Sequence, residues 1–173
     1  MDNVILIGFM GVGKTSVGKL LASRLGAPFV DLDTEIETKN AMKIPEMFEK
    51  YGESYFRAKE KEVVKEMAKR KNIVIATGGG AVKDEENRKI FKDSGFIIAL
   101  TASPEVIYER TTAEDNRPLL ADLSDDEKRK KIADMMAERK SFYENADYTV
   151  DTGELSPMQV VEDILHWLKM RRG

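Results

Sequence analysis

A run of glycines, a lysine and a threonine near the N-terminus has the spacing of a phosphate-binding loop. The run follows the apolar stretch Val4–Ile7, leads through Ser16 into a segment with helical spacing, and reads Gly8-Phe9-Met10-Gly11-Val12-Gly13-Lys14-Thr15. Glycines let the backbone curl so that successive N–H groups converge on one anion, and the following helix adds the positive end of its dipole. In such a loop the lysine reaches the outer phosphates and the threonine hydroxyl ligates Mg²⁺. Because strand, motif and helix agree, we interpret the run as a nucleoside triphosphate site and not as a chance glycine-rich turn.

Two aspartates, Asp31 and Asp33, lie at the end of a second apolar run, Phe29–Leu32. If the extended conformation persists there, both carboxylates point the same way. One carboxylate could then orient water on Mg²⁺ while the other contacts an acceptor hydroxyl, as phosphoryl transfer to an alcohol requires. Alternatively, Asp33 caps a helix that begins at Thr34. The local sequence leaves both interpretations open.

Consecutive glycines, Gly78, Gly79 and Gly80, follow Thr77 and the apolar run Ile73–Ala76. Such a stretch is too flexible to be favoured for stability, so close approach of the backbone to a ligand explains it better than a plain loop, which stays an alternative. The preceding run also lacks the terminal aspartate with which many motor and switch ATPases hold magnesium. This absence favours a small-molecule kinase.

Arginines supply the remaining chemistry. Arg57 follows an aromatic residue at a predicted helix start, Arg117 lies in a segment with no clear period, and Arg139 lies on a polar helical face. Each could be a solvated charge. However, two guanidinium groups that converge on a carboxylate would hold an acidic substrate, and a third in a closing loop would neutralise charge on the transferred phosphoryl group.

Short apolar runs alternate with longer helical patterns along the chain, which predicts an α/β fold with a parallel sheet. The predicted strands are Val4–Ile7, Phe29–Leu32, Ile73–Ala76, Phe96–Leu100 and Tyr148–Val150. Helices are predicted from the phosphate loop to Gly26 and over Glu53–Arg70, Glu85–Lys92, Pro104–Thr111, Asp125–Phe142 and Pro157–Met170, the last capped by Ser156. The segment from Thr112 to Leu123 is predicted to be a lid.

The amino-acid composition limits the number of domains, the partners and the location that we expect for this protein. The 173 residues are 42% hydrophobic and 34% charged, which suits one domain over residues 1–173. A formal net charge of −3 disfavours nucleic acid as a partner, and the absence of cysteine excludes disulfides and thiolate metal sites. No apolar run approaches a membrane span, so we expect no membrane association, and we expect a cytoplasmic monomer.

The joint order of these motifs resembles the shikimate kinase family over nearly the whole chain. The motifs that carry the resemblance are the phosphate loop, Asp31 with Asp33, the block Gly52-Glu53-x-x-Phe56-Arg57-x-x-Glu60, Gly78-Gly79-Gly80, Arg117-Pro118-Leu119-Leu120, Arg139, and Val150-Asp151-Thr152 with Pro157. The resemblance implies ATP-dependent phosphorylation of the 3-hydroxyl of shikimate, a step of aromatic amino-acid biosynthesis, with Mg²⁺. It also implies a three-layer P-loop kinase fold with sheet order 2-3-1-4-5, a substrate-binding segment at about residues 33–61 and a lid at about residues 112–123.

The resemblance further implies a role for each matching residue. Asp33 is expected to contact the acceptor hydroxyls as the candidate base, with Lys14 and Arg117 on the transferred phosphate. Thr15 is expected to ligate Mg²⁺ directly and Asp31 to act through water. The nucleotide contacts are expected from Gly8, Met10, Gly11, Val12, Gly13, Lys14, Thr15, Ser16, Arg110, Arg117, Thr152 and Pro157. The substrate contacts are expected from Asp33, Phe48, Phe56, Arg57, Glu60, Gly78, Gly79, Gly80 and Arg139, of which the two arginines hold the carboxylate.

Two other functions compete with this interpretation. A gluconate-type kinase has a similar size and fold, although its acceptor has no obvious need for Gly78–Gly80 together with Arg57. A nucleotide-dependent regulatory module would hydrolyse ATP slowly and act through partners, but the sequence shows neither an appended domain nor an unassigned amphipathic surface.

Overall fold

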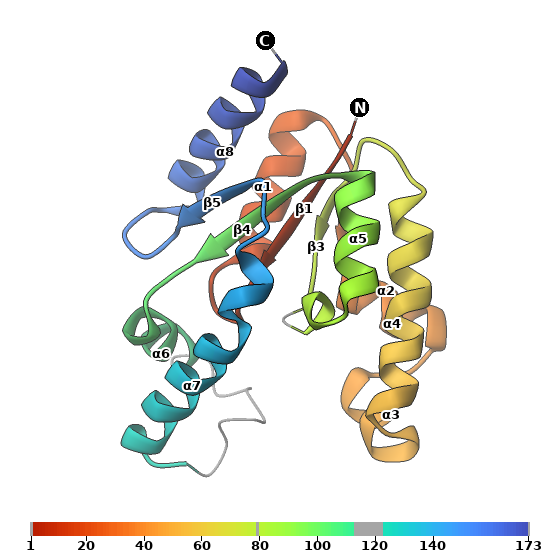
Figure 1. Cartoon of the computed structure of the whole chain (residues 1–173), viewed down its shortest axis with the longest axis vertical. Coiled ribbons are helices and arrows are strands. Elements are labelled where there is room, and N and C mark those ends of the chain that lie inside the picture. Colours follow the sequence, from red (N-terminus) through yellow and green to blue (C-terminus); the bar gives the residue numbers. More distant parts are fainter. Residues whose placement is uncertain (1, 79, 113–122, 173) are drawn as a thin grey trace.

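The computed structural model describes residues 2–78, 80–112 and 123–172 and contains one parallel sheet (Figure 1). Its strands are β1 (Asn3–Gly8), β2 (Phe29–Asp31), β3 (Val74–Ala76), β4 (Gly95–Thr101) and β5 (Tyr148–Asp151). They pair in the order β2-β3-β1-β4-β5, every neighbouring pair being parallel. The predicted α/β class and strand order are therefore confirmed, with strand ends that differ by a residue or so.

The helices connect successive strands and lie on both faces of this sheet. They are α1 (Lys14–Leu25), α2 (Leu32–Asn40), α3 (Ile44–Tyr51), α4 (Glu53–Ala68), α5 (Glu85–Ser94), α6 (Pro104–Thr112), α7 (Asp125–Tyr143) and α8 (Pro157–Arg172), with a short 3₁₀ turn, η1 (Ala81–Lys83). Periodicity alone predicted neither α2 nor α3, although the family resemblance implied a substrate-binding segment there.

The central strand explains the three layers. Every residue of β1 is buried, as expected for a strand that is covered on both faces. Val4 and Leu6 belong to the core cluster that includes α1 and α8, whereas Ile5 and Ile7 belong to the cluster that includes α4 and α5. Alternate side chains of β1 thus point into the two hydrophobic cores, one on each face of the sheet.

Two predicted helix ends have the geometry that their residues favour. Gly26 closes α1 in the left-handed conformation, at φ 65°. Before α8, the Ser156 hydroxyl accepts a hydrogen bond from the Gln159 N–H at 3.2 Å, and the Gln159 side chain accepts one from the Ser156 N–H at 2.8 Å. This reciprocal capping box fixes where α8 leaves the sheet.

Helical segments extend past the carboxyl ends of the strands on two sides, with α2 and α3 on one and α6 and α7 on the other (Figure 1). In parallel α/β sheets, ligands bind at this edge. Most of the predicted lid, residues 113–122, lies outside the described residues. Within the described ranges, no helix has the length and apolarity to cross a membrane.

Candidate active site

The phosphate loop joins the end of β1 to the start of α1 in a conformation that depends on its glycines. Gly11 has φ 80° and Gly13 has φ 96°, values that side chains rarely tolerate. Gly13 occupies the N-cap position of α1 and, being a glycine, has no side chain with which to satisfy the first helical N–H groups. These groups and the positive end of the helix are therefore available to an anion.

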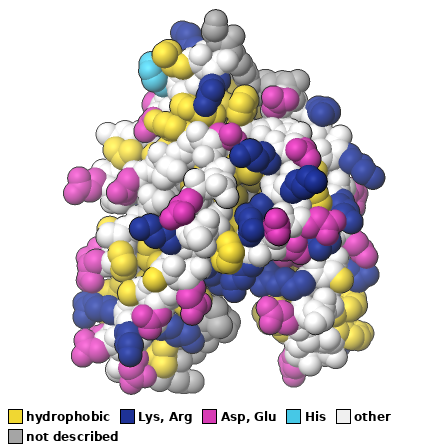
Figure 2. Space-filling view, in the orientation of Figure 1, with side chains coloured by type: hydrophobic (Ala, Val, Ile, Leu, Met, Phe, Trp, Pro, Cys, Tyr) yellow, Lys and Arg dark blue, Asp and Glu magenta, His cyan; other side chains and the backbone are white. Residues whose placement is uncertain are grey.

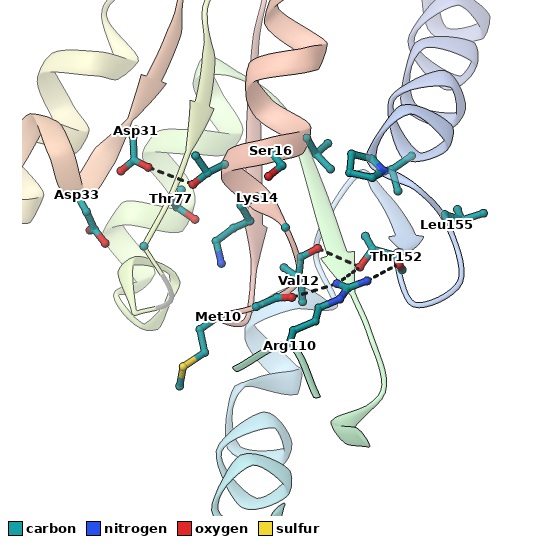
Figure 3. A pocket seen from close by; sticks show the side chains of 17 residues that line it. Met10, Val12, Lys14, Ser16, Asp31, Asp33, Thr77, Arg110, Thr152 and Leu155 are labelled. Carbon is teal, nitrogen blue, oxygen red and sulfur yellow. Dashed lines mark hydrogen bonds between the residues drawn. The ribbon is translucent and has the colours of Figure 1, made fainter. Parts of the chain in front are cut away.

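Lys14 and Thr15 begin α1 and place their polar atoms at the loop. The Lys14 ammonium donates to the carbonyl oxygens of Gly8 and, at 3.0 Å, of Phe9. The Thr15 hydroxyl donates to Asp31 Oδ2 at 3.3 Å (Figure 3). The loop thus brings a cation and a hydroxyl–carboxylate pair to the place where a phosphate would lie.

The acidic pair differs from the sequence-based expectation. The extended conformation does not persist beyond Asp31, because α2 begins at Leu32. Asp31 is the N-cap of that helix and its Oδ1 accepts from the Thr34 N–H at 3.2 Å, so the alternative in which Asp33 is the cap is wrong. Asp33 instead lies in the first turn of α2, and both carboxylates still line one cavity.

The environment of Asp33 perturbs its acidity. Burial raises the pKa of this carboxyl above its ordinary value, and the negative charge of Asp31 raises it further. The positive charges of Lys14 and Arg57 oppose this rise. A buried carboxyl with a raised pKa beside a phosphate loop is suited to accept a hydrogen bond or a proton from an alcohol.

The glycines after β3 make room for two functional side chains. A Cβ on Gly78 would lie 2.6 Å from Asp33 Oδ1, and a Cβ on Gly80 would lie 2.6 Å from Arg57 Nη2. The turn therefore lets a carboxylate and a guanidinium pack directly on the backbone. The sequence predicted close approach of a ligand to the backbone at these glycines. In the described structure the groups that approach Gly78 and Gly80 are protein side chains, and the approach of a ligand stays a prediction.

Arg57 is held by carboxylates of its own helix. Its Nη1 lies 2.9 Å from Glu60 Oε1, and its Nε lies 3.6 Å from Glu53 Oε1. Glu60 is only 2% exposed, and burial raises its pKa although the adjacent Arg57 opposes that shift. Phe56 lies under the same guanidinium at 5.2 Å and packs against Phe48 with ring centroids 4.9 Å apart. The arginine is therefore oriented before any substrate arrives.

Arg139 approaches the same region from α7. Its guanidinium lies over the Phe9 ring, 5.2 Å from the centroid. Desolvation and then the positive charges of Arg139 and Arg57 lower the pKa of Lys83, at the end of η1. Both arginines, which come from different helices, thus contribute to the positive charge around Lys83. That they hold one carboxylate stays a prediction.

On the far side of the loop, Arg110 and Thr152 tie β5 to the loop backbone. Arg110 Nη1 donates to the Gly11 carbonyl at 3.0 Å and to Thr152 Oγ1 at 3.2 Å, and its Nη2 donates to the Thr152 carbonyl at 2.9 Å. Thr152 Oγ1 also lies 3.0 Å from the Val12 carbonyl. Figure 3 shows this network on one side of Lys14, with Asp31 and Asp33 on the other.

A cavity of about 740 Å³ joins these groups. The predicted nucleotide, metal and catalytic residues that line it are Met10, Gly11, Val12, Gly13, Lys14, Thr15, Ser16, Asp31, Asp33, Arg110, Thr152 and Pro157, and the predicted substrate residue Gly78 lines it too. The volume is in the range of ligand pockets. Its lining also includes Val17 and Val160, to which the sequence assigned no role in the site.

Comparison with known proteins agrees with this geometry. The model of the family described as shikimate kinase matches residues 10–169. The chain belongs to the shikimate kinase family.

Relatives match over almost their full length. A shikimate kinase of Thermodesulfovibrio yellowstonii is 48% identical over 165 residues, which is 95% of this chain and 94% of that protein. One of Pelotomaculum thermopropionicum is 45% identical over 171 residues, with 98% of this chain and 96% of that protein covered. A solved shikimate kinase of Acinetobacter baumannii, in complex with shikimate, has a TM-score of 0.90 at 38% identity and covers 99% of this chain and 94% of its own.

The gluconate-type alternative receives support at the level of fold alone. A gluconokinase of Sinorhizobium meliloti has a TM-score of 0.59 at 16% identity, covering 98% of this chain and 92% of its own. At that identity, the likeness says nothing about the acceptor. The specific resemblance is to the shikimate kinase family.

The residues at the loop suit Mg²⁺. Among the described residues, no group of three or more His, Cys, Asp or Glu side chains could hold a metal on its own. Mg²⁺ in kinases instead keeps several waters and is bound by one or two protein oxygens together with substrate phosphates. The Thr15 hydroxyl beside Asp31 supplies such oxygens at the loop.

Some predicted contacts lie apart from the cavity or beyond the described structure. Several of the described substrate contacts do not line the cavity, namely Phe48 on α3, Phe56, Arg57 and Glu60 on α4, Gly80 in the glycine turn, and Arg139 on α7. Gly8 is also outside the lining, and a Cβ there would meet the Leu100 carbonyl oxygen at 2.5 Å. Gly79 and Arg117 lie outside the described residues, so their roles stay predictions.

Proposed function

We propose that this protein transfers the γ-phosphoryl group of ATP to the 3-hydroxyl of shikimate, giving shikimate 3-phosphate and ADP. The observation that carries the proposal is the turn at Gly78 and Gly80, which supports the Asp33 carboxylate and the Arg57 guanidinium at neighbouring points of one backbone. The Asp33 carboxylate can accept a hydrogen bond from a hydroxyl, and the Arg57 guanidinium can bind a carboxylate. The turn thereby holds both groups near the phosphate loop. Shikimate carries both functions on a rigid ring.

The nucleotide side follows from the loop. We infer that the N–H groups around Gly11 and Gly13 bind the phosphates, and that the Lys14 ammonium exchanges its carbonyl partners for phosphate oxygens. We infer that the base end of the nucleotide reaches Arg110, Thr152 and Pro157, which line the same cavity as the loop. Arg117, from the predicted lid, is expected to reach the transferred phosphoryl group.

We infer that Thr15 holds Mg²⁺ directly and that Asp31 holds it through water. When bound, the ion neutralises charge on the phosphate oxygens. The contact between the Thr15 hydroxyl and Asp31 Oδ2 supports this assignment, because it already brings both oxygens together at the loop.

On the acceptor side, Asp33 accepts the hydrogen bond of the 3-hydroxyl and aligns its oxygen with the phosphorus. Loose transition states of phosphoryl transfer need little base assistance, so alignment alone gives this carboxylate a catalytic role. Arg57 and Arg139 hold the carboxylate of shikimate. Glu60 keeps Arg57 in place through its buried ion pair.

The test is ADP release, measured in a coupled assay with ATP and Mg²⁺ in the presence of shikimate, gluconate or neither. We expect rapid turnover with shikimate only. Turnover of gluconate without turnover of shikimate would show that the acceptor is a sugar acid and not shikimate. Slow ATP hydrolysis that shikimate fails to accelerate would favour a regulatory module. The cytoplasmic location and the monomeric state stay predictions, and sedimentation of the purified protein checks the second.

A further inference from the structure

We propose that Thr77 is a further protein oxygen of the Mg²⁺ site and that its hydroxyl accepts a hydrogen bond from a water bound to the ion. This inference deepens the metal site of the proposed function and rests on it. In the sequence, Thr77 is marked only by its place before the three glycines, so its relation to Thr15 and Asp31 comes from the fold.

The order of the sheet places Thr77 between the two residues that we assign to the metal. Strand β3 lies between β2 and β1, and its last residue, Ala76, pairs with Asp31 on one side and with Leu6 on the other. Thr77 follows Ala76 directly. The hydrogen bond from Thr15 to Asp31 therefore crosses the end of β3, and Figure 3 shows Thr77 next to it.

A single carbonyl fixes the direction of the Thr77 side chain. Both the N–H and the hydroxyl of Thr77 donate to the Leu6 carbonyl, at 3.1 Å and 3.0 Å. A hydroxyl has one hydrogen and two lone pairs, so the Thr77 oxygen, having donated, can only accept. Among the described residues, no donor contacts this oxygen. Thr77 is only 4% exposed but lines the cavity at the phosphate loop, where a bound group can supply the donor.

An oxygen that can only accept distinguishes between the groups that a kinase site binds. Phosphate oxygens are themselves acceptors, so they would find no hydrogen at Thr77. A water bound to Mg²⁺ turns its lone pairs toward the ion and its hydrogens outward, and it therefore donates. Mg²⁺ in kinases keeps several such waters. The Thr77 hydroxyl is thus suited to a water of the ion and not to a phosphate oxygen.

The shape of the molecule leaves room for a hydrated ion at this place. Figure 2 shows a hollow between the two lower parts of the molecule, below the carboxyl ends of the strands in Figure 1. The cavity at these strand ends, of about 740 Å³, can admit a nucleotide together with the waters of its ion.

The first experiment measures the affinity for the metal itself. Mn²⁺ takes the same oxygen ligands as Mg²⁺, and electron paramagnetic resonance reports the free ion, so Mn²⁺ is titrated into the protein with ADP, with ADP alone as the blank. In Thr77→Val we expect the Mn²⁺ affinity of the protein–ADP complex to fall by about threefold to tenfold, the range for one neutral hydrogen bond. Thr77→Ser keeps the hydroxyl and should retain the affinity of the parent protein.

Two controls separate a metal contact from a structural effect. In Thr77→Val the Leu6 carbonyl still accepts from the N–H of residue 77, so ADP binding without metal should stay within about twofold of the parent. Thr101→Val removes a hydroxyl that donates to the Val150 carbonyl at 3.5 Å, at the end of β4 and apart from the cavity lining. This second variant should bind Mn²⁺ as the parent protein does.

The second experiment follows turnover of shikimate at varied Mg²⁺. The Mg²⁺ concentration that gives the half-maximal rate should rise in Thr77→Val by the same factor of about threefold to tenfold. Because the lost contact is made to a water of the ion and not to the acceptor, KM for shikimate should stay within about twofold of the parent value.

Unchanged Mn²⁺ affinity in Thr77→Val, or an equal loss in Thr77→Val and Thr77→Ser, would overturn this proposal. A loss of metal-free ADP affinity as large as the loss of Mn²⁺ affinity would also overturn it, because it would reveal a change in the loop itself. A parent protein that binds Mn²⁺ with ADP but fails to turn over shikimate would refute the proposed acceptor, and the Mn²⁺ titration would still decide the role of Thr77.

Discussion

Replacing Gly78 by Ala should damage catalysis without damaging the nucleotide site. The new Cβ would lie 2.6 Å from Asp33 Oδ1 and 3.0 Å from Oδ2, so the carboxylate has no free direction along the turn. Reaching an ordinary contact of 3.4 Å requires a shift of about 0.8 Å, and a misplacement of about 1 Å in a reacting geometry costs on the order of 10²-fold. We therefore expect kcat to fall by about tenfold to a hundredfold.

Gly80→Ala is the matched variant, because it adds the same methyl group two residues away. Its Cβ would meet the Arg57 guanidinium, at 2.6 Å from Nη2 and 2.8 Å from Nη1. The backbone at Gly80, with φ −106° and ψ −7°, accepts alanine. Since Arg57 binds the substrate carboxylate in our proposal, this variant should raise KM for shikimate by about threefold to tenfold and affect kcat less.

The assay is steady-state ADP release at varied shikimate and varied ATP, with a thermal melt of each protein. Glycine-to-alanine changes at permitted backbone angles stabilise by about 0.4–1 kcal/mol, so neither variant should melt lower unless the displaced side chain strains the fold. A Gly78→Ala protein with unaltered kcat, or two variants with the same kinetic defect, would refute the division of labour along this turn.

Three further outcomes follow from the site. Asp33→Asn should lower kcat with ATP affinity retained, and the fall of kcat as pH drops through the raised pKa of Asp33 should disappear with it; unchanged kcat would contradict its role. Arg57→Ala should weaken shikimate binding by about 2–5 kcal/mol, and Arg57→Ala with Glu60→Gln, which leaves no unpaired buried carboxylate, should show the same binding loss with less destabilisation. Nearly normal affinity in the double variant would exclude Arg57 as a carboxylate ligand. Thr152→Val should raise KM for ATP, because it removes the hydroxyl that accepts from Arg110 Nη1 and helps to hold this guanidinium at the Gly11 carbonyl. Thr152→Ser, which keeps a hydroxyl, should retain the parent KM, and equal KM in both variants would show that the hydroxyl has no such role.

The strands and the phosphate loop could be predicted because their signals are local. The β1 run Val4–Ile7 is continuously apolar, as a strand covered on both faces must be, and the loop's glycines act through their own φ angles. The capping box at Ser156 is equally local. Each of these features depends on residues within a few positions of one another, and the sequence displays them directly.

Helix α2 was indicated only as an alternative, with Asp33 as its cap, and the structure begins the helix and places its cap two residues earlier. Only Leu32 and Ile36 of α2 are buried, which is too few apolar positions to show a helical period. Leu32 continues the apolar run of β2, so the predicted strand Phe29–Leu32 is one residue longer than β2 in the structure. The cap that ends the strand is Asp31, a residue assigned by its motif to magnesium, and a carboxylate can serve both purposes because Oδ1 accepts from Thr34 while Oδ2 faces Thr15.

The glycine turn shows why a motif can be recognised before its mechanism is understood. The sequence indicated that a ligand approaches Gly78 and Gly80 closely, but the groups found there are side chains, from α2 in one case and from α4 in the other. Neither contact leaves a trace in the local pattern, since it joins residues far apart along the chain. One short segment after β3 therefore positions both the Asp33 carboxylate and the Arg57 guanidinium. A shift of its backbone should alter substrate binding and phosphoryl transfer together, whereas a substitution at Gly78 or at Gly80 alone should separate the two effects.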